Sequence, residues 1–173
     1  MSYEVAINKA WEDLAKVSLN DNLTLKFFND EYALDVKAKK ILSLSCNVKA
    51  KDFTSILLLH YLIKKLGGLP KVTGNWLTFR EISGVEGYGP AFKERAIDPI
   101  IRKLKGLRQD KSMLLEALEG VPVLVKFFKQ DDEFNADANI YFDSSIKDIF
   151  CTEDIVVLSG MVAGRLKEFL EEA

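Results

Sequence analysis

The sequence predicts an α+β protein in which helices pack against a mostly antiparallel sheet, in one domain spanning residues 1–173. Two patterns of apolar residues indicate this class: helical spacing in some stretches and strict alternation in others. Several alternating stretches are joined by short polar turns, which is typical of hairpins. No internal repeat or linker divides the chain, and its length corresponds to about one domain.

Apolar side chains at helical spacing predict helices at both ends of the chain, at residues 3–17 and 152–171. A third helix is expected from Asp52 to about Leu66, ended by Gly67-Gly68. Its apolar residues cover more than one face, which favours a central position in the core.

Proline placement indicates a further helix after the middle of the chain. Pro90 is suited to a first helical turn, because its missing N–H has no helical partner there. Pro99 is expected to kink this helix, and residues 109–118 are expected to form another short helix.

Alternating or continuous apolar runs predict the strands. A hairpin is expected over residues 22–36, with a third strand near 41–44. Residues 76–82 are interpreted as a strand from their aromatic and β-branched content. The near-continuous apolar run 121–128 predicts a central strand covered on both faces, paired with 138–142.

Charge and composition restrict the function. The 24 Lys and Arg residues against 26 Asp and Glu give a net charge of −2, which provides no general footprint for nucleic acid. One histidine and two distant cysteines exclude multi-histidine and cysteine-rich metal sites, so no metal site is predicted. No apolar stretch is long enough to span a bilayer, and no signal peptide is visible. A cytoplasmic protein is expected.

The stretch from Ile56 to Arg95 is the candidate ligand site, because it contains the histidine, one tryptophan and most of the glycines. Small-molecule sites combine apolar clefts with a few polar groups, and this stretch supplies both. The candidate residues are His60, Tyr61, Trp76, Arg80, Glu81, Tyr88 and Arg95.

Each candidate has a structural and a functional interpretation. His60 is either a neutral core histidine held by a polar partner, or an axial ligand or general base. Arg80 and Glu81 would point to opposite faces of a strand, so one would face inward. Arg80 could bind a carboxylate or phosphate, and the structural alternative is an ion pair or a helix-cap contact. The loop from Gly84 to Gly89 either binds an anion before a helix or is a flexible loop closed by Tyr88.

Two charged runs have the same ambiguity. The acidic connection Asp131–Asp137 lacks the EF-hand pattern, so a solvated hairpin is favoured over a cation site, with Asp143 as a helix cap. The basic residues around Arg102 and Lys105 are either a solvated helix face or a contact surface for an acidic partner.

A set of motifs resembles the prokaryotic domain-of-unknown-function family 3786. They are Leu59-His60-Tyr61-Leu62, Gly74 to Glu81, Tyr88-Gly89-Pro90-Ala91-Phe92, Asp132-Glu133-Phe134 and Phe142-Asp143. The resemblance covers nearly the whole chain and implies no assigned activity. It suggests a link to corrinoid or one-carbon chemistry in anaerobes, although some members carry a cysteine-rich iron–sulfur segment that this chain lacks.

Three hypotheses follow. The first is an accessory protein that binds a small ligand or cofactor. The second is an enzyme with Arg80 as the anchor for an anionic substrate and His60 or Glu81 as acid and base. The third is a protein-interaction module. The sequence leaves the catalytic residues, the cofactor and the oligomeric state undetermined.

Overall fold

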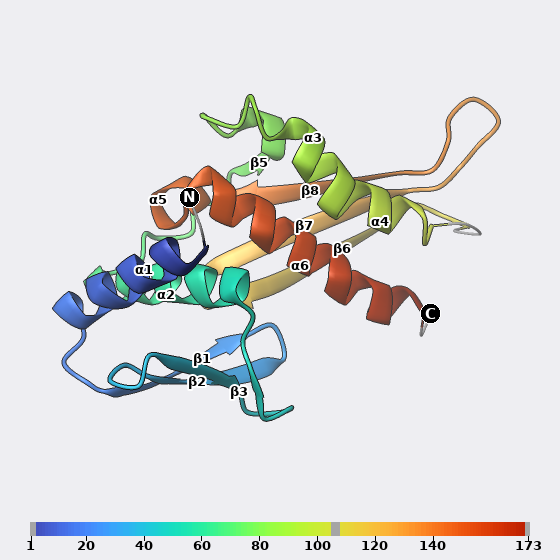
Figure 1. Cartoon of the computed structure of the whole chain (residues 1–173). Helices are drawn as coiled ribbons and strands as arrows, with labels where there is room; N and C mark the ends of the chain where they lie inside the picture. The colour runs from blue at the N-terminus through green and yellow to red at the C-terminus, as the bar shows by residue number, and fades with distance from the viewer. Residues whose placement is uncertain (1–2, 105–107, 172–173) are drawn as a thin grey trace. The chain divides into compact units, whose positions relative to one another are not determined.

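The computed structural model describes residues 3–104 and 108–171 and confirms the α+β class (Figure 1). The chain divides into two compact units. Unit 1 comprises Met1–Lys71 and Leu118–Gly120, and unit 2 comprises Val72–Ala117 and Val121–Ala173. The described residues form two four-stranded antiparallel sheets, one in each unit, rather than the single sheet that we expected. The single domain expected from the chain length stays a prediction.

The sheet of unit 1 is built from consecutive strands in the order β1-β2-β3-β4. They are β1 (Asn22–Phe27), β2 (Asp30–Asp35), β3 (Lys40–Ser43) and β4 (Val48–Lys49). The predicted hairpin is confirmed, and its register places Leu25 opposite Tyr32. Leu34 of β2 lies opposite Ile41 of β3. These four side chains are buried because alternation places them on the same face of the sheet.

Two helices complete unit 1 and pack against each other: α1 (Tyr3–Val17) and α2 (Asp52–Gly67) (Figure 1). Three consecutive leucines of α2, Leu57–Leu59, have no exposed surface, which confirms the predicted central helix. The helix ends where Gly68 adopts a φ of 104° and donates its N–H to the carbonyl of Lys65.

Unit 1 also contains the turn between β6 and β7. The Tyr61 hydroxyl donates a hydrogen bond of 2.9 Å to the carbonyl of Glu119. Lys65 of α2 forms an ion pair with the Glu119 carboxylate. Gly120 has a φ of 74°, a conformation that glycine adopts without steric cost.

The sheet of unit 2 has the strand order β5-β8-β7-β6. Its strands are β5 (Trp76–Thr78), β6 (Lys111–Leu118), β7 (Val121–Phe128) and β8 (Asp137–Asp143). The helix predicted at residues 109–118 was wrong. Residues 111–118 contain good helix formers, but pairing with β7 overrides that propensity, and the better buried Met113, Leu115 and Ala117 alternate with exposed neighbours.

The β7–β8 register determines the two faces of this sheet. Val123 lies opposite Phe142 and Val125 opposite Ile140, and all four are buried on the face that the helices cover (Figure 1). Leu124 and Tyr141 alternate onto the other face and are half-buried. β7 is therefore central in the sheet, but it is not buried on both faces as we had predicted.

The helices of unit 2 follow from its prolines. Pro90 lies in the first turn of α3 (Gly89–Phe92), as predicted. The irregularity expected at Pro99 takes the form of a π-helical turn, η2 (Lys93–Ile97), before α4 (Asp98–Ile101). Because proline has no N–H, Pro99 cannot make the normal helical hydrogen bond, and a π turn accommodates the gap.

Two further helices close unit 2: α5 (Ile146–Ile149) and α6 (Thr152–Glu171). Helix α6 contacts η2 and α4 in front of the sheet (Figure 1). Gly160 of α6 faces Arg95 of η2, and a Cβ there would lie 3.6 Å from the Arg95 carbonyl oxygen, an ordinary van der Waals contact. Among the described residues, no helix is long and apolar enough to span a membrane.

Asp143 holds the chain segments at one end of this sheet together. Its buried carboxylate accepts hydrogen bonds from the N–H groups of Thr73, Gly74 and Ser145. Burial acts to raise the pKa of Asp143, but the hydrogen bonds from Ser145, Thr73 and Gly74 outweigh it and lower the pKa from 3.8 to about 2. The N-cap residue of α5 is Ser145, so Asp143 does not cap this helix as we had predicted. It instead joins Ser145 to the chain before β5.

Asp143 should make the protein sensitive to acid. The pKa of Asp143 is lower in the folded protein than in the unfolded protein. Its contribution to the free energy of unfolding is therefore complete above pH 3.8 and is lost as the pH falls through about 2. Urea unfolding should show that the free energy of unfolding falls by an amount on the order of 2 kcal/mol across that pH range because of this group. Asp143→Asn should be less stable at neutral pH and lack this part of the pH dependence. Equal acid sensitivity in both proteins would contradict the assignment.

One cooperative unfolding transition is expected, because each unit is built from more than one chain segment. Trp11 lies in unit 1 and Trp76 in unit 2, and they are the only tryptophans. Tryptophan fluorescence of Trp76→Phe therefore reports on unit 1, and that of Trp11→Phe reports on unit 2. The two reporters should each follow the same urea midpoint as circular dichroism of the same variant. A reporter that changes before or after the circular dichroism signal would indicate two domains.

Candidate functional site

The predicted site residues belong to both compact units. His60 and Tyr61 lie on α2 in unit 1, and the other five lie in unit 2. Tyr61 is buried and its hydroxyl binds the Glu119 carbonyl, which is a structural role. His60 is half-buried near Asp13 of α1. The pKa of Asp13 is lowered mainly by its hydrogen bond with Lys16, and His60 adds a smaller electrostatic contribution.

Arg80 and Glu81 differ from the prediction. The strand ends at Thr78, and both residues lie in a single 3₁₀ turn, η1 (Phe79–Glu81), where both are exposed. Neither points inward, so the interpretation of a buried charge beside a strand was wrong. The physical reason is a capping box: Glu81 Oε2 accepts 2.7 Å hydrogen bonds from the N–H and the hydroxyl of Thr78.

The same capping box lowers the pKa of Glu81, through the side-chain and then the backbone hydrogen bond of Thr78. A lowered pKa makes the carboxylate a weaker general base. The contacts of Glu81 therefore support a structural role at the start of the turn.

Hydrogen bonds connect the glycine-rich loop, through Tyr88 and Gly84, to the start of α6. Its hydroxyl donates a 2.9 Å hydrogen bond to Glu153, and Thr152 donates to the carbonyl of Gly84 at 3.4 Å. The hydrogen bond to Glu153, followed by burial, raises the pKa of Tyr88. These contacts match the interpretation of a loop closed by Tyr88. The acidic first turn of α6 does not favour an anion there.

Cys151 lies beside this loop and donates its S–H to Asp154 at 3.3 Å. Burial raises the pKa of the Cys151 thiol, and the Asp154 carboxylate also raises it electrostatically. A raised pKa keeps the sulfur protonated at neutral pH, so Cys151 is not an activated nucleophile.

The last two candidates are in separate places within unit 2. Trp76 is half-buried on β5, opposite Asp143 of β8. Arg95 is exposed on the π turn η2, and its backbone faces Gly160. Arg102, in the basic run, is also exposed, whereas Lys105 lies outside the described residues.

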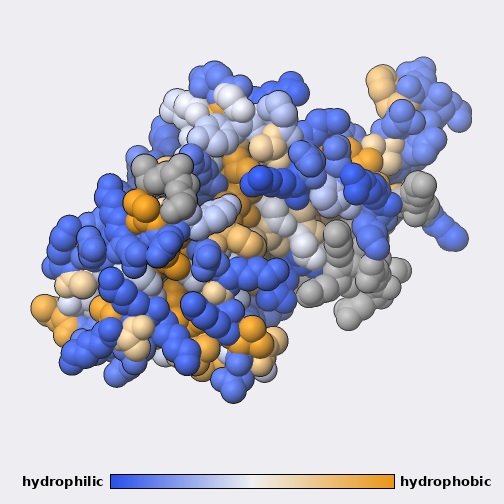
Figure 2. All heavy atoms as spheres, in the orientation of Figure 1, coloured by the Kyte–Doolittle hydropathy of each residue, from blue (hydrophilic) through white to orange (hydrophobic). Residues whose placement is uncertain are grey.

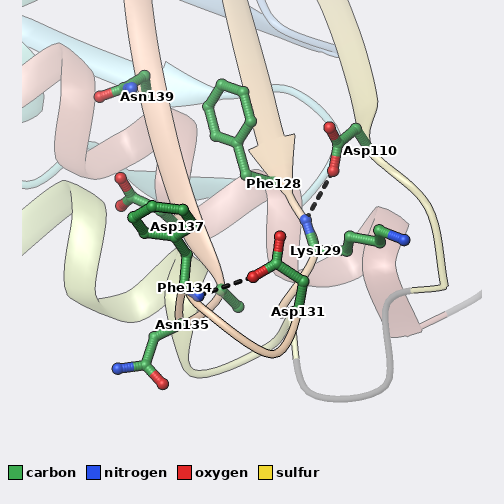
Figure 3. A pocket seen from close by; sticks show the side chains of 9 residues that line it. Asp110, Phe128, Lys129, Asp131, Phe134, Asn135, Asp137 and Asn139 are labelled. Carbon is green, nitrogen blue, oxygen red and sulfur yellow. Dashed lines mark hydrogen bonds between the residues drawn. The ribbon is translucent and has the colours of Figure 1, made fainter.

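A cleft that the sequence did not predict lies at the far end of the unit 2 sheet, where β7 passes into β8 (Figure 3). Its volume is about 690 Å³. Phe128 of β7 and Asn139 of β8 contribute side chains from the strands (Figure 3). Both are on the sheet face opposite the helices, because their neighbours Phe127 and Ala138 are buried on the helix-covered face.

The β7–β8 connection forms the next part of the cleft and is held in a compact turn. The Asp131 carboxylate accepts hydrogen bonds from the N–H groups of Glu133 and Phe134, at 2.9 and 2.7 Å. The Asp131 N–H in turn donates to the Phe134 carbonyl at 3.0 Å. This turn presents the Phe134 ring with 68% of its surface exposed (Figure 3). A single exposed apolar side chain is common on protein surfaces, so the ring is of interest because it lines a cleft.

Three carboxylates line the cleft, and each is oriented by a backbone N–H. Asp110 Oδ1 binds the N–H of Lys129, Asp131 Oδ1 binds Glu133 and Phe134, and Asp137 Oδ1 binds Ala138. Within the described part of the chain, the second oxygen of each carboxylate has no protein partner. Hydrogen bonding by Phe134 and then Glu133 lowers the pKa of Asp131, so this group is ionised at neutral pH.

Among the described residues, no group of three or more His, Cys, Asp or Glu side chains is arranged to hold a metal ion. Asp131–Asn135 and Asp137 are exposed, which agrees with the solvated hairpin favoured from the sequence.

Two features could have identified the cleft from the sequence. One is Phe134 in the run Gln130–Asp137, whose other residues, apart from Ala136, are acidic or carry an amide. The other is the Phe127-Phe128 pair at the end of a strand, since alternation requires one ring to leave the covered face. Asp110 could not be found in this way, because it lies within the segment 109–118 that we had interpreted as a helix.

Sequence comparison identifies the family. The chain matches the family described as Domain of unknown function (DUF3786), over residues 10–109 and 103–165. The chain belongs to this family. Searches of curated proteins and of solved structures found no match. The matched ranges of this DUF3786 protein include every residue of the cleft and every residue that we predicted for the site.

Phe134 of the DUF3786 protein should contribute almost nothing to stability. Phe134→Ala removes a ring that is 68% exposed, so the free energy of unfolding should change by less than about 0.5 kcal/mol. Phe127→Ala is the matched control: that ring is 2% exposed, and its removal should cost about 3–5 kcal/mol. Urea denaturation measures both. A large loss in Phe134→Ala would mean that the ring has a structural role.

Proposed function

We propose that this DUF3786 protein is a cytoplasmic accessory protein that binds a small organic molecule in the β7–β8 cleft. The observation that supports this most is the cleft itself, with two phenylalanine rings and a few oriented polar groups. Its volume of about 690 Å³ falls within the range usual for small-molecule sites, roughly 300–1,000 Å³. The proposal keeps the expected function but moves the site away from Ile56–Arg95.

Oriented polar groups distinguish this cleft from an ordinary surface hollow. The carboxylates of Asp110, Asp131 and Asp137 are held by backbone N–H groups, so a ligand would not have to order them. The amides of Asn135 and Asn139 add both donors and acceptors (Figure 3). The aromatic rings supply apolar contact area.

The family resemblance adds corrinoid or one-carbon metabolism as a biological context for the proposal. In that context His60 was a candidate axial ligand, and an imidazole is a suitable donor for such a role. His60 is half-buried on α2, in the unit that does not contain the cleft. The proposed cleft therefore does not depend on His60, and the two ideas can be tested separately.

Native mass spectrometry of the protein purified from its own host tests the proposal. We expect an added mass of small-molecule size on the wild-type chain. The double variant Phe134→Ala/Asn139→Ala should lose most of it, because both side chains line the cleft. Asp132→Asn and His60→Ala are controls outside the cleft and should retain it. No added mass, or an added mass that survives in the double variant, would contradict the proposal.

The visible absorption of the same samples tests the metabolic context, because a bound corrinoid is coloured. Colour that disappears in His60→Ala but persists in the cleft variant would assign the cofactor to α2 and not to the cleft.

A further inference from the structure

We infer that the β7–β8 cleft selects a small organic cation, a molecule that carries an amine or ammonium group beside an apolar body. This inference rests on the proposed function and specifies its ligand class. Three features of unit 2 support it: two aromatic rings, the charge of the lining, and a cation–aromatic pair on the same sheet face.

The aromatic rings come from two different segments. Phe128 lies on β7, and Phe134 lies on the turn of the β7–β8 connection (Figure 3). The faces of aromatic rings are electron-rich and attract cations within about 6 Å of the ring centroid. Because hydrogen bonds with Asp131 hold the turn, the backbone of Phe134 is already positioned in the absence of a ligand.

The charge of the lining favours a cation over an anion. Three carboxylates line the cleft, against the one ammonium of Lys129 among its described residues. The second carboxylate oxygen of Asp110, Asp131 and Asp137 has no protein partner in the described part of the chain, so each can accept a hydrogen bond from a ligand. An anion entering the cleft would meet like charges, which is unfavourable.

The same sheet face already holds a cation against an aromatic ring. The ammonium of Lys126 lies 5.2 Å from the centroid of the Tyr141 ring. Lys126 is paired across the strands with Asn139, a residue of the cleft. The geometry of this face therefore places ring faces where an ammonium group can reach them.

A metal ion is a poor alternative occupant. A divalent metal needs several oxygen ligands at about 2–2.6 Å from one point. The described residues provide no such group. The carboxylates come instead from separate segments around a cleft of about 690 Å³, which suits a molecule of several atoms.

A pair of probes that differ only in charge tests the inference: choline and its neutral analogue 3,3-dimethylbutan-1-ol. Titration of ¹⁵N-labelled protein would be followed through the side-chain amides of Asn135 and Asn139. We expect choline to bind at least about fivefold more tightly than the alcohol, the ratio that about 1 kcal/mol of cation–π and charge attraction gives. Inorganic phosphate should leave both amides unchanged.

Variants separate the two sources of this preference. Phe134→Leu removes the π face but retains an apolar side chain. It should weaken the binding of choline about two- to fivefold and leave the affinity for the alcohol unchanged. Asp137→Asn removes one charge, and the Oδ1 of the new side chain can still accept a hydrogen bond from the Ala138 N–H. This variant should also bind choline more weakly. Asp132→Asn removes the same charge from a residue of the same connection that does not line the cleft, and it should have a much smaller effect.

Each outcome has a defined meaning. Equal binding of choline and the alcohol, or preferential binding of phosphate, would overturn the cationic ligand class but leave the cleft as a binding site. Equal loss of choline affinity in Asp132→Asn and Asp137→Asn would also overturn it, because a diffuse acidic surface would then explain the binding. If neither organic probe perturbs the cleft amides, the inference fails. The added mass on protein from the host then decides separately whether the proposed function also fails.

Discussion

The antiparallel pairing of β7 with β8 is the constraint on which unit 2 depends. It places Val123 against Phe142 and Val125 against Ile140, so one continuous apolar face is available to the helices. A shift of one residue would exchange the two faces and move these buried side chains into water. The same register turns Phe128 and Asn139 to the opposite face. The core and the cleft are thus two consequences of a single pairing.

The ends of this strand pair have different roles. At one end, Asp143 is buried and accepts hydrogen bonds from several backbone N–H groups, which joins the chain before β5 to the start of α5. At the other end, the carboxylates of Asp131 and Asp137 are exposed, and one oxygen of each has no partner among the described residues. Satisfied buried polar groups stabilise a structure, whereas oriented and unsatisfied ones at the surface are available for a ligand. This contrast is the reason that we propose a binding site at the connection rather than at Asp143.

The stretch Ile56–Arg95 shows that unusual residue types can have structural roles. Its histidine and tyrosine pack on a central helix, and Glu81 caps a 3₁₀ turn. Tyr88 fastens the glycine-rich loop to α6. Several of its unusual residues satisfy local structural requirements: closing a loop, capping a turn and ending a helix at a glycine with positive φ. The binding site that we propose rests instead on the cleft lined by Phe134, a phenylalanine exposed among acids.

The sequence by itself determined the α+β class, the helices α1, α2 and α6, and the hairpins β1–β2 and β7–β8. These elements have clear apolar periodicity and turn residues, both of which are local properties. It also indicated the family, through motifs spread along the chain. Tertiary structure decided that residues 111–118 form a strand, because Met113, Leu115 and Ala117 are compatible with either period and only pairing with β7 chooses between them. It also decided that the strands form two sheets and that Asp110 joins Phe128 and Phe134 around one cleft. Those outcomes depend on contacts between residues distant in the chain, which local patterns do not encode.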